Sequence, residues 1–187
     1  MRKTLIALSL TALFSTPVLA ETLDERAQAS RAAVQQFAGM LKGELQAGMK
    51  AGGPTQAIGV CRDKAPEIAA QISKEKGWDV GRTSLKTRNP ANTPDAWERE
   101  VMNKFEARKA AGEDVKYLEH FEVVEHDGKR EFRYMKAIPT QAMCLGCHGA
   151  NLSPEVVKTL DRLYPEDKAR GFAEGDLRGA FTITQPM

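Results

Sequence analysis

The sequence predicts an α+β domain in which helices flank an antiparallel sheet. Apolar residues recur at three- and four-residue intervals in the first half of the chain, as in amphipathic helices. Two alternating segments rich in β-branched and aromatic residues flank an Asp-Gly pair in the second half. The strand–helix alternation of a parallel sheet is not visible. The 187 residues fit one domain that can bury a sizeable core.

The first half of the chain predicts helices. Residues 21–50 carry an apolar stripe that predicts a long helix, which the Gly-Gly-Pro run at 52–54 is expected to end. A second stripe over 58–72 predicts a helix in two pieces. Pro66 is costly inside a helix, and Asp63 is a suitable cap for a new start.

A strand, a loop and a further helix are expected next. Gly77 is expected to close the preceding helix, and residues 78–87 predict a strand. Asn89-Pro90-Ala91-Asn92 is typical of a loop. Thr93-Pro94 resembles a cap followed by proline at the first helical position, which predicts a helix to about Ala111.

The second half predicts the sheet. Residues 120–126 and 129–138 flank Asp127-Gly128, a pair that suits a two-residue hairpin turn. Ser153-Pro154 predicts a helix through about Leu163, and 177–185 predicts a last strand.

The N-terminus has the pattern of a secretory signal. Arg2 and Lys3 precede an apolar run over 5–14, and a small residue, Ala20, ends a plausible cleavage site. The run is shorter than the roughly 20 residues that span a bilayer. We therefore expect a signal peptide over 1–20 and a single domain over 21–187 in the periplasm.

The charge of the mature chain is balanced. The full sequence has 27 Lys and Arg against 25 Asp and Glu, and Arg2 and Lys3 leave with the signal, so 25 face 25. A neutral protein gives no electrostatic support to a nucleic-acid partner or to binding of anionic membranes. The cleavage point has no cysteine for lipid attachment. We expect no nucleic acid and no membrane anchor.

Cys144-Leu145-Gly146-Cys147-His148 predicts one covalently attached c-type haem. Two thiols separated by two residues can form thioethers with the two vinyl groups of one porphyrin. His148 then lies under the ring, where its imidazole can bind the iron as proximal ligand. A redox dithiol and half of a zinc site are the alternatives. A dithiol does not need His148, and a zinc site would usually need a second Cys/His pair nearby.

Cys61 has no evident disulfide partner, because the haem would occupy the other two cysteines. A lone thiol is unusual in an oxidising compartment. It is either a small buried apolar residue or the second axial ligand, opposite His148. The other candidates for that position are two methionines, Met102 and Met135, and two histidines, His120 and His126. Met143 lies too close to the attachment site to reach the other face of the ring.

Arg82, Lys86 and Arg88 alternate along the strand expected near the haem. They are candidates for ion pairs with the two haem propionates, a contact that suits arginine. The alternative is a solvated strand face.

Four stretches together resemble a known family: 57–61, 82–92, 144–149 and 175–181. They are similar to exported haem-binding proteins of unsettled role, typified by a cyanobacterial monohaem cytochrome c. The resemblance covers essentially the whole mature chain. It implies a PAS-like fold, a central antiparallel sheet with helices around it. It also implies that the iron is ligated by His148 and by an upstream cysteine, at the position of Cys61.

Two functions are consistent with these features. One is redox or small-gas sensing, in which the signal passes to another protein. The other is a soluble electron carrier between periplasmic proteins. No enzyme is expected, because the sequence shows no clear distal acid or base of the kind that a peroxidase needs. A peroxidase stays an alternative. The partner is an unknown redox or signalling protein, and a small gas is the candidate ligand.

Overall fold

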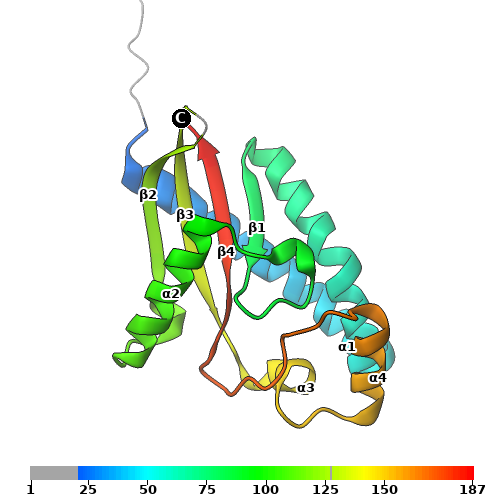
Figure 1. The fold of residues 1–187 in the computed structure, drawn as a ribbon. Helices are drawn as coiled ribbons and strands as arrows, with labels where there is room; N and C mark the ends of the chain where they lie inside the picture. The colour runs from blue at the N-terminus through cyan, green and yellow to red at the C-terminus, as the bar shows by residue number, and fades with distance from the viewer. Residues whose placement is uncertain (1–20, 127) are drawn as a thin grey trace, which may run out of the picture.

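The computed structural model describes residues 21–126 and 128–187, and the predicted signal peptide lies outside them. The α+β prediction is confirmed. A four-stranded antiparallel sheet has the order β1-β4-β3-β2, with helices on both faces (Figure 1). The strands are β1 Asp79–Thr83, β2 Glu119–His126, β3 Lys129–Pro139 and β4 Leu177–Pro186; the helices are α1 Leu23–Lys76, α2 Ala96–Ala110, α3 Leu145–His148 and α4 Pro154–Leu163.

Helix α1 is bent into two arms, as the glycine pair predicted. Its start is capped reciprocally by Thr22 and Glu25. Gly52 and Gly53 have non-helical backbone angles, and Gly53 has a φ of 68° that favours glycine. The two arms run back along each other, since the Gln36 amide on the first donates to the Glu75 carboxylate on the second at 2.9 Å.

The predicted break before Pro66 is wrong. The second arm of α1 continues through Pro66 to Lys76, and Asp63 pairs with the neighbouring Arg62 side chain rather than capping a new helix. Proline removes one backbone hydrogen bond there. Burial of Ala65 and Ile68, on either side of it, stabilises the helical path. Gly77 ends the helix with a φ of 70°, as predicted.

Two other predicted boundaries move by several residues. Strand β1 ends at Thr83 rather than near residue 87, because Ser84 N–H bonds to the Asn92 carbonyl and turns the chain away. Helix α2 begins after Asp95, whose carboxylate accepts the Glu98 N–H at 2.7 Å. The helix is therefore capped by Asp95 rather than by Thr93, in keeping with the stronger preference for aspartate at this position. Strands β2 and β3 pair antiparallel as predicted, and Asp127 of the predicted turn lies outside the described residues.

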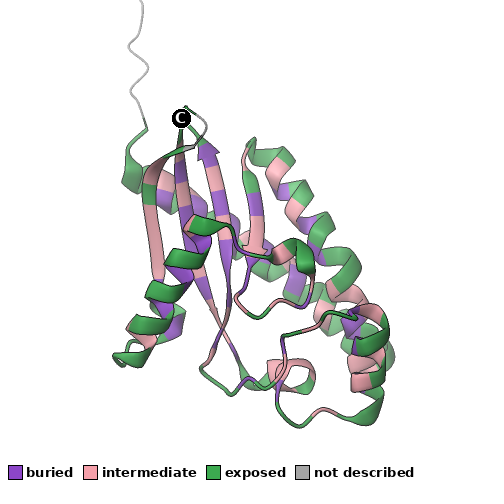
Figure 2. Ribbon diagram, in the orientation of Figure 1, coloured by how far each residue is buried: buried purple, intermediate pink, exposed green. Residues whose placement is uncertain are grey.

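The sheet separates two cores. Alternate side chains of a strand point to opposite faces, so Tyr134 packs toward α1 and Met135 toward α2. Figure 2 shows the buried segments along the strands and on the inner faces of these helices, with exposed outer surfaces. A third, smaller cluster joins Ile58 of α1 to Leu160 of α4. Among the described residues, no helix has a stretch long and apolar enough to cross a membrane.

Candidate haem-binding site

One large cavity lies next to the third cluster. It is enclosed by α1, the loop after β1 and the Cys-x-x-Cys-His segment. Its empty volume is about 1260 Å³, part of it open to solvent. All three cysteines and His148 contribute to its walls. The polar and sulfur-bearing lining comprises Met49, Cys61, Arg82, Thr83, Ser84, Thr87, Arg88, Asn89, Asn92, Met143, Cys144, Cys147, His148, Tyr164 and Arg178.

The attachment motif folds as two short helical turns. A 3-10 turn at Ala142–Cys144 runs into α3, and Cys144 is its junction. Gly149 then ends α3, and its N–H bonds to the Leu145 carbonyl at 2.9 Å. A Cβ at Gly149 would lie 2.6 Å from that carbonyl oxygen, closer than side chains tolerate. Glycine is therefore required directly after His148 for the turn to close.

The imidazole of His148 is oriented by its second ring nitrogen. Nδ1 lies 2.9 Å from the Ala169 carbonyl oxygen, a geometry in which Nδ1–H donates. The Nε2 lone pair is then left for a metal, as is usual for histidine ligands. The segment after Ala169 also holds the motif backbone, since Phe172 N–H donates to the His148 carbonyl at 2.9 Å. Burial, with Arg178 and Arg88 nearby, lowers the pKa of His148 to about 3, so the ring is neutral.

A buried ion pair supports this arrangement. Arg88 and Asp167 approach to 3.0 Å, with side chains only 8% and 1% exposed. Arg88 Nη2 also donates to the Cys147 carbonyl at 2.6 Å and to the Ala169 carbonyl at 3.0 Å. The pair therefore ties the attachment motif to the segment that orients His148. Arg88 was predicted to contact propionates, but its donors are largely engaged here.

Cys61 lies half-buried on the second arm of α1 and lines the cavity. It stands one turn after Ala57 and Ile58, which line the same wall. Burial raises the pKa of the Cys61 thiol, opposed by the charges of three arginines: Arg82, Arg88 and Arg178. None of the three cysteines is in a disulfide.

The other candidate axial ligands lie elsewhere. Met102 and Met135 are buried in the core between the sheet and α2. His120 pairs with the Glu122 carboxylate at 3.0 Å, outside the cavity lining. The side chain of His126 lies outside the described part of the chain. Met143 does line the cavity, together with Met49, which the sequence did not single out.

The predicted propionate contacts divide three ways. Arg82 lines the cavity, Arg88 lines it but is paired with Asp167, and Lys86 is exposed and is not part of the lining. Arg178, from the start of β4, was missed. It belongs to the 175–181 stretch that carries the family resemblance. A single arginine on a strand forms no repeating pattern, so nothing in the sequence marked it as a cavity residue.

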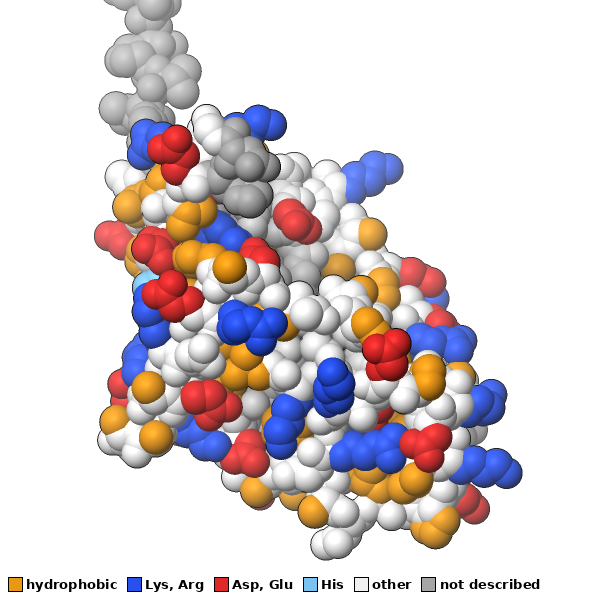
Figure 3. All heavy atoms as spheres, in the orientation of Figure 1, with side chains coloured by type: hydrophobic (Ala, Val, Ile, Leu, Met, Phe, Trp, Pro, Cys, Tyr) orange, Lys and Arg blue, Asp and Glu red, His pale blue; other side chains and the backbone are white. Residues whose placement is uncertain are grey.

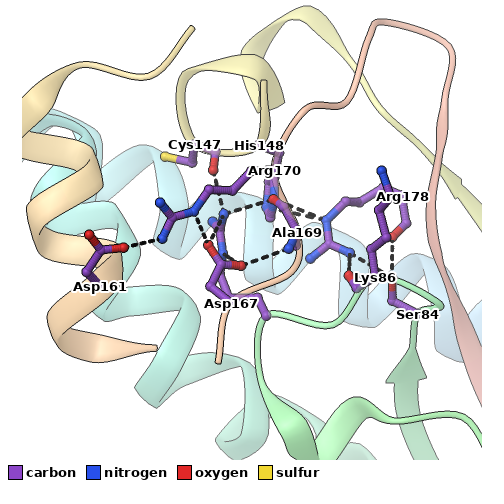
Figure 4. Close-up of polar contacts among 10 residues, drawn as sticks. Ser84, Lys86, Cys147, His148, Asp161, Asp167, Ala169, Arg170 and Arg178 are labelled. Carbon is purple, nitrogen blue, oxygen red and sulfur yellow. Dashed lines mark hydrogen bonds and ion pairs between the residues drawn. The ribbon is translucent and has the colours of Figure 1, made fainter. Parts of the chain in front are cut away.

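The surroundings of Arg178 connect the two sides of the site (Figure 4). Its Nη1 donates to Ser84 Oγ at 3.0 Å, and its Nε lies 3.2 Å from His148 Nδ1. Burial and the charges of Arg88 and Arg82 lower the pKa of Arg178 to about 10, so it stays charged at neutral pH.

The donor set fits a haem better than a zinc ion. Among residues 21–126 and 128–187, no group of three or more His, Cys, Asp or Glu side chains is clustered to hold a metal ion by itself. Cys144, Cys147 and His148 instead lie along one wall of a roomy cavity, with Cys61 on another element. Ligands that surround a space suit a metal carried in a large planar cofactor.

Comparisons with known proteins agree with the haem prediction. A family model described as Tll0287-like matches residues 17–186. Among solved structures, the chain is similar to the cyanobacterial heme-protein Tll0287, with 27% sequence identity and a TM-score of 0.67. That match covers 87% of this chain and 96% of the other. No curated protein matches.

Proposed function

Because this chain belongs to the Tll0287-like family, we propose that it is a periplasmic c-type cytochrome with one covalent haem that senses redox state or a small ligand. The observation that carries the proposal is the common wall formed by Cys144, Cys147 and His148, with Nδ1 of the histidine bonded to the Ala169 carbonyl so that the Nε2 lone pair can serve a metal. The similarity to a solved heme-protein supports the cofactor.

Each residue has one role in this proposal. Cys144 and Cys147 hold the porphyrin through thioethers, and His148 binds the iron through Nε2. Cys61 is the distal ligand, since it lines the cavity from α1, an element separate from the motif. A haem iron held in this way supplies one-electron chemistry and, where an axial bond yields, a position for a small gas.

The origin of the two ligands favours sensing over simple electron carriage. His148 lies on α3, which the Arg88–Asp167 pair fastens to the segment around Ala169. Cys61 lies on the long hairpin of α1. A change in a bond between Cys61 and the iron would therefore act on α1, an element separate from the one that holds His148, and a partner protein could read that change.

The surface is consistent with a protein partner rather than nucleic acid. On the face in Figure 3, acidic and basic side chains are interspersed, without a broad field of one sign. We propose an unidentified redox or signalling protein as the partner and no enzymatic turnover.

Attachment is tested on protein matured with the cytochrome c assembly machinery. Acid–acetone should leave the colour on the chain, because thioethers do not dissociate, and intact mass should show one haem on a chain that begins near Glu21. Cys144→Ala/Cys147→Ala is the matched control, from which acid–acetone should remove any bound haem. If the unaltered protein loses its colour too, covalent attachment is refuted.

Sensing is tested separately from attachment. Carbon monoxide added to the ferrous protein should displace the distal ligand and change the hydrogen exchange of α1 amides around Cys61. A midpoint potential matched to periplasmic carriers, with no change in α1 on reduction or on gas binding, would favour the electron carrier instead.

A further inference from the structure

We propose that Arg82 and Arg178 form a carboxylate-binding pair that holds the two haem propionates. This rests on the proposed haem function, and it assigns a propionate site that differs from the strand-face set Arg82, Lys86 and Arg88. The two arginines come from neighbouring strands, β1 and β4, and line the cavity that also contains His148.

Neither arginine has an acidic partner in the part of the chain that the structure describes. Arg82 makes no side-chain hydrogen bond there, and its guanidinium lies 5.5 Å from the centre of the Phe37 ring. Arg178 Nη1 donates to neutral groups, the Ser84 hydroxyl at 3.0 Å and the Lys86 carbonyl at 3.5 Å. Its Nε lies beside the His148 ring, and its guanidinium stands 5.4 Å from the centre of the Phe172 ring. Half-buried cations without counter-ions are costly. The fold thus provides positive charge that a bound anion would stabilise.

The other two cations predicted to contact the propionates, Arg88 and Lys86, are less suited to that role. Arg88 is neutralised by Asp167 and donates to two carbonyls of the motif segment. Lys86 is exposed, and its Nζ lies 5.2 Å from the Phe172 ring, outside the cavity lining. Among residues 21–126 and 128–187, only Arg82 and Arg178 combine a place on the cavity wall with a charge that no acidic side chain balances.

The charges of the proposed ligand set balance those of the pair. Ferric iron in a porphyrin dianion is +1, a Cys61 thiolate adds −1, and two ionised propionates add −2. The sum of −2 equals the two arginines. Guanidinium groups also match carboxylates geometrically, since two parallel N–H donors can meet both oxygens. Reduction adds one negative charge, so both arginines favour the ferrous state relative to a site without them.

The first test compares haem with its dimethyl ester, whose propionates cannot ionise. In the full mature chain carrying Cys144→Ala/Cys147→Ala, titration should show tighter binding of haem than of the ester. Arg82→Met and Arg178→Met should each weaken haem binding about tenfold to a hundredfold, as loss of one charge-assisted bond does, and leave ester binding little changed. Lys158→Met, which removes an exposed charge from α4, is the control and should change neither.

Equal binding of haem and ester, or a haem preference that survives both arginine changes, would overturn the pair. Failure to bind either porphyrin would count against the haem function and not against the pair alone.

The second test does not depend on non-covalent loading. In covalently matured protein, Arg178→Met should lower the midpoint potential, Arg178→Lys should keep it near the original, and Lys158→Met should leave it unchanged. An Arg178→Met potential equal to that of Lys158→Met would overturn the proposal.

Discussion

Arg88→Met tests the role of the buried ion pair most severely. The change leaves the Asp167 carboxylate, 1% exposed, with Arg170 at 2.7 Å as its remaining cationic partner, and it removes the donors to the Cys147 and Ala169 carbonyls. Breaking a buried pair by removing one member costs about 3–5 kcal/mol, and Arg170 keeps the cost at the lower end, about 3 kcal/mol. For a chain of this length, each kcal/mol shifts the melting temperature by about 2–4 °C, so a fall of roughly 6–12 °C is expected.

The assay is urea and thermal unfolding of the mature holoprotein, followed by circular dichroism. The control is Lys104→Met, which breaks the exposed Lys104–Glu100 pair, 49% and 66% exposed, and should cost no more than about 0.5 kcal/mol. Arg88→Lys keeps the charge but loses the fork and should fall between them. If Arg88→Met costs no more than Lys104→Met, the pair does not fasten the motif as argued.

The remaining predictions concern the motif turn, acid stability and the bend in α1. Gly149→Ala places a Cβ 2.6 Å from the Leu145 carbonyl oxygen, so haem incorporation measured by pyridine haemochrome should fall, whereas Gly146→Ala, with open space around its Cβ, should incorporate normally. The hydrogen bond from Arg31 and that from Tyr134 hold the pKa of Glu119 below its ordinary value despite burial. Its stabilisation is therefore full above about pH 4.3 and lost as pH falls through the folded pKa, so the stability difference from Glu119→Gln should shrink there in acid unfolding. Gly53→Ala forces alanine to a φ of 68° and a ψ of −159°, a region almost restricted to glycine, and should cost about 1–3 kcal/mol in urea unfolding; equal stability would show that the bend is not held at these angles.

Local chemistry made several features predictable from sequence. Gly77 and the glycine pair at 52–53 stand where the backbone needs conformations that other residues resist. The pairing of two alternating strands was predictable from the Asp-Gly pair between them, a sequence typical of hairpin turns. The common place of Cys144, Cys147 and His148 on one cavity wall was predictable from their short spacing in the chain. Each of these depends on a few neighbouring residues, so each was visible without the fold.

Features that depend on tertiary contacts were not predictable. Pro66 remains inside α1 because its neighbours are buried, which its own propensity does not reveal. Arg88 and Arg82 look equivalent on the predicted strand, yet of the two only Arg88 meets an acid in the described part of the chain, Asp167, 79 residues later. Arg178 reaches the cavity because β4 pairs beside β1. Long-range pairing decides these roles, and a single sequence does not encode it in any short pattern.

The most direct test of the account is the ferric spectrum of Cys61→Ala beside that of the unaltered protein. With His148 and Cys61 as ligands, the unaltered protein should show a rhombic low-spin electron resonance and a thiolate charge-transfer band in the near infrared. Cys61→Ala should lose both, and its midpoint potential should rise because an anionic donor has gone. Met49→Leu and Met143→Leu, at the two methionines that line the cavity, should retain them. A Cys61→Ala protein with an unchanged spectrum and potential would contradict the proposed ligation.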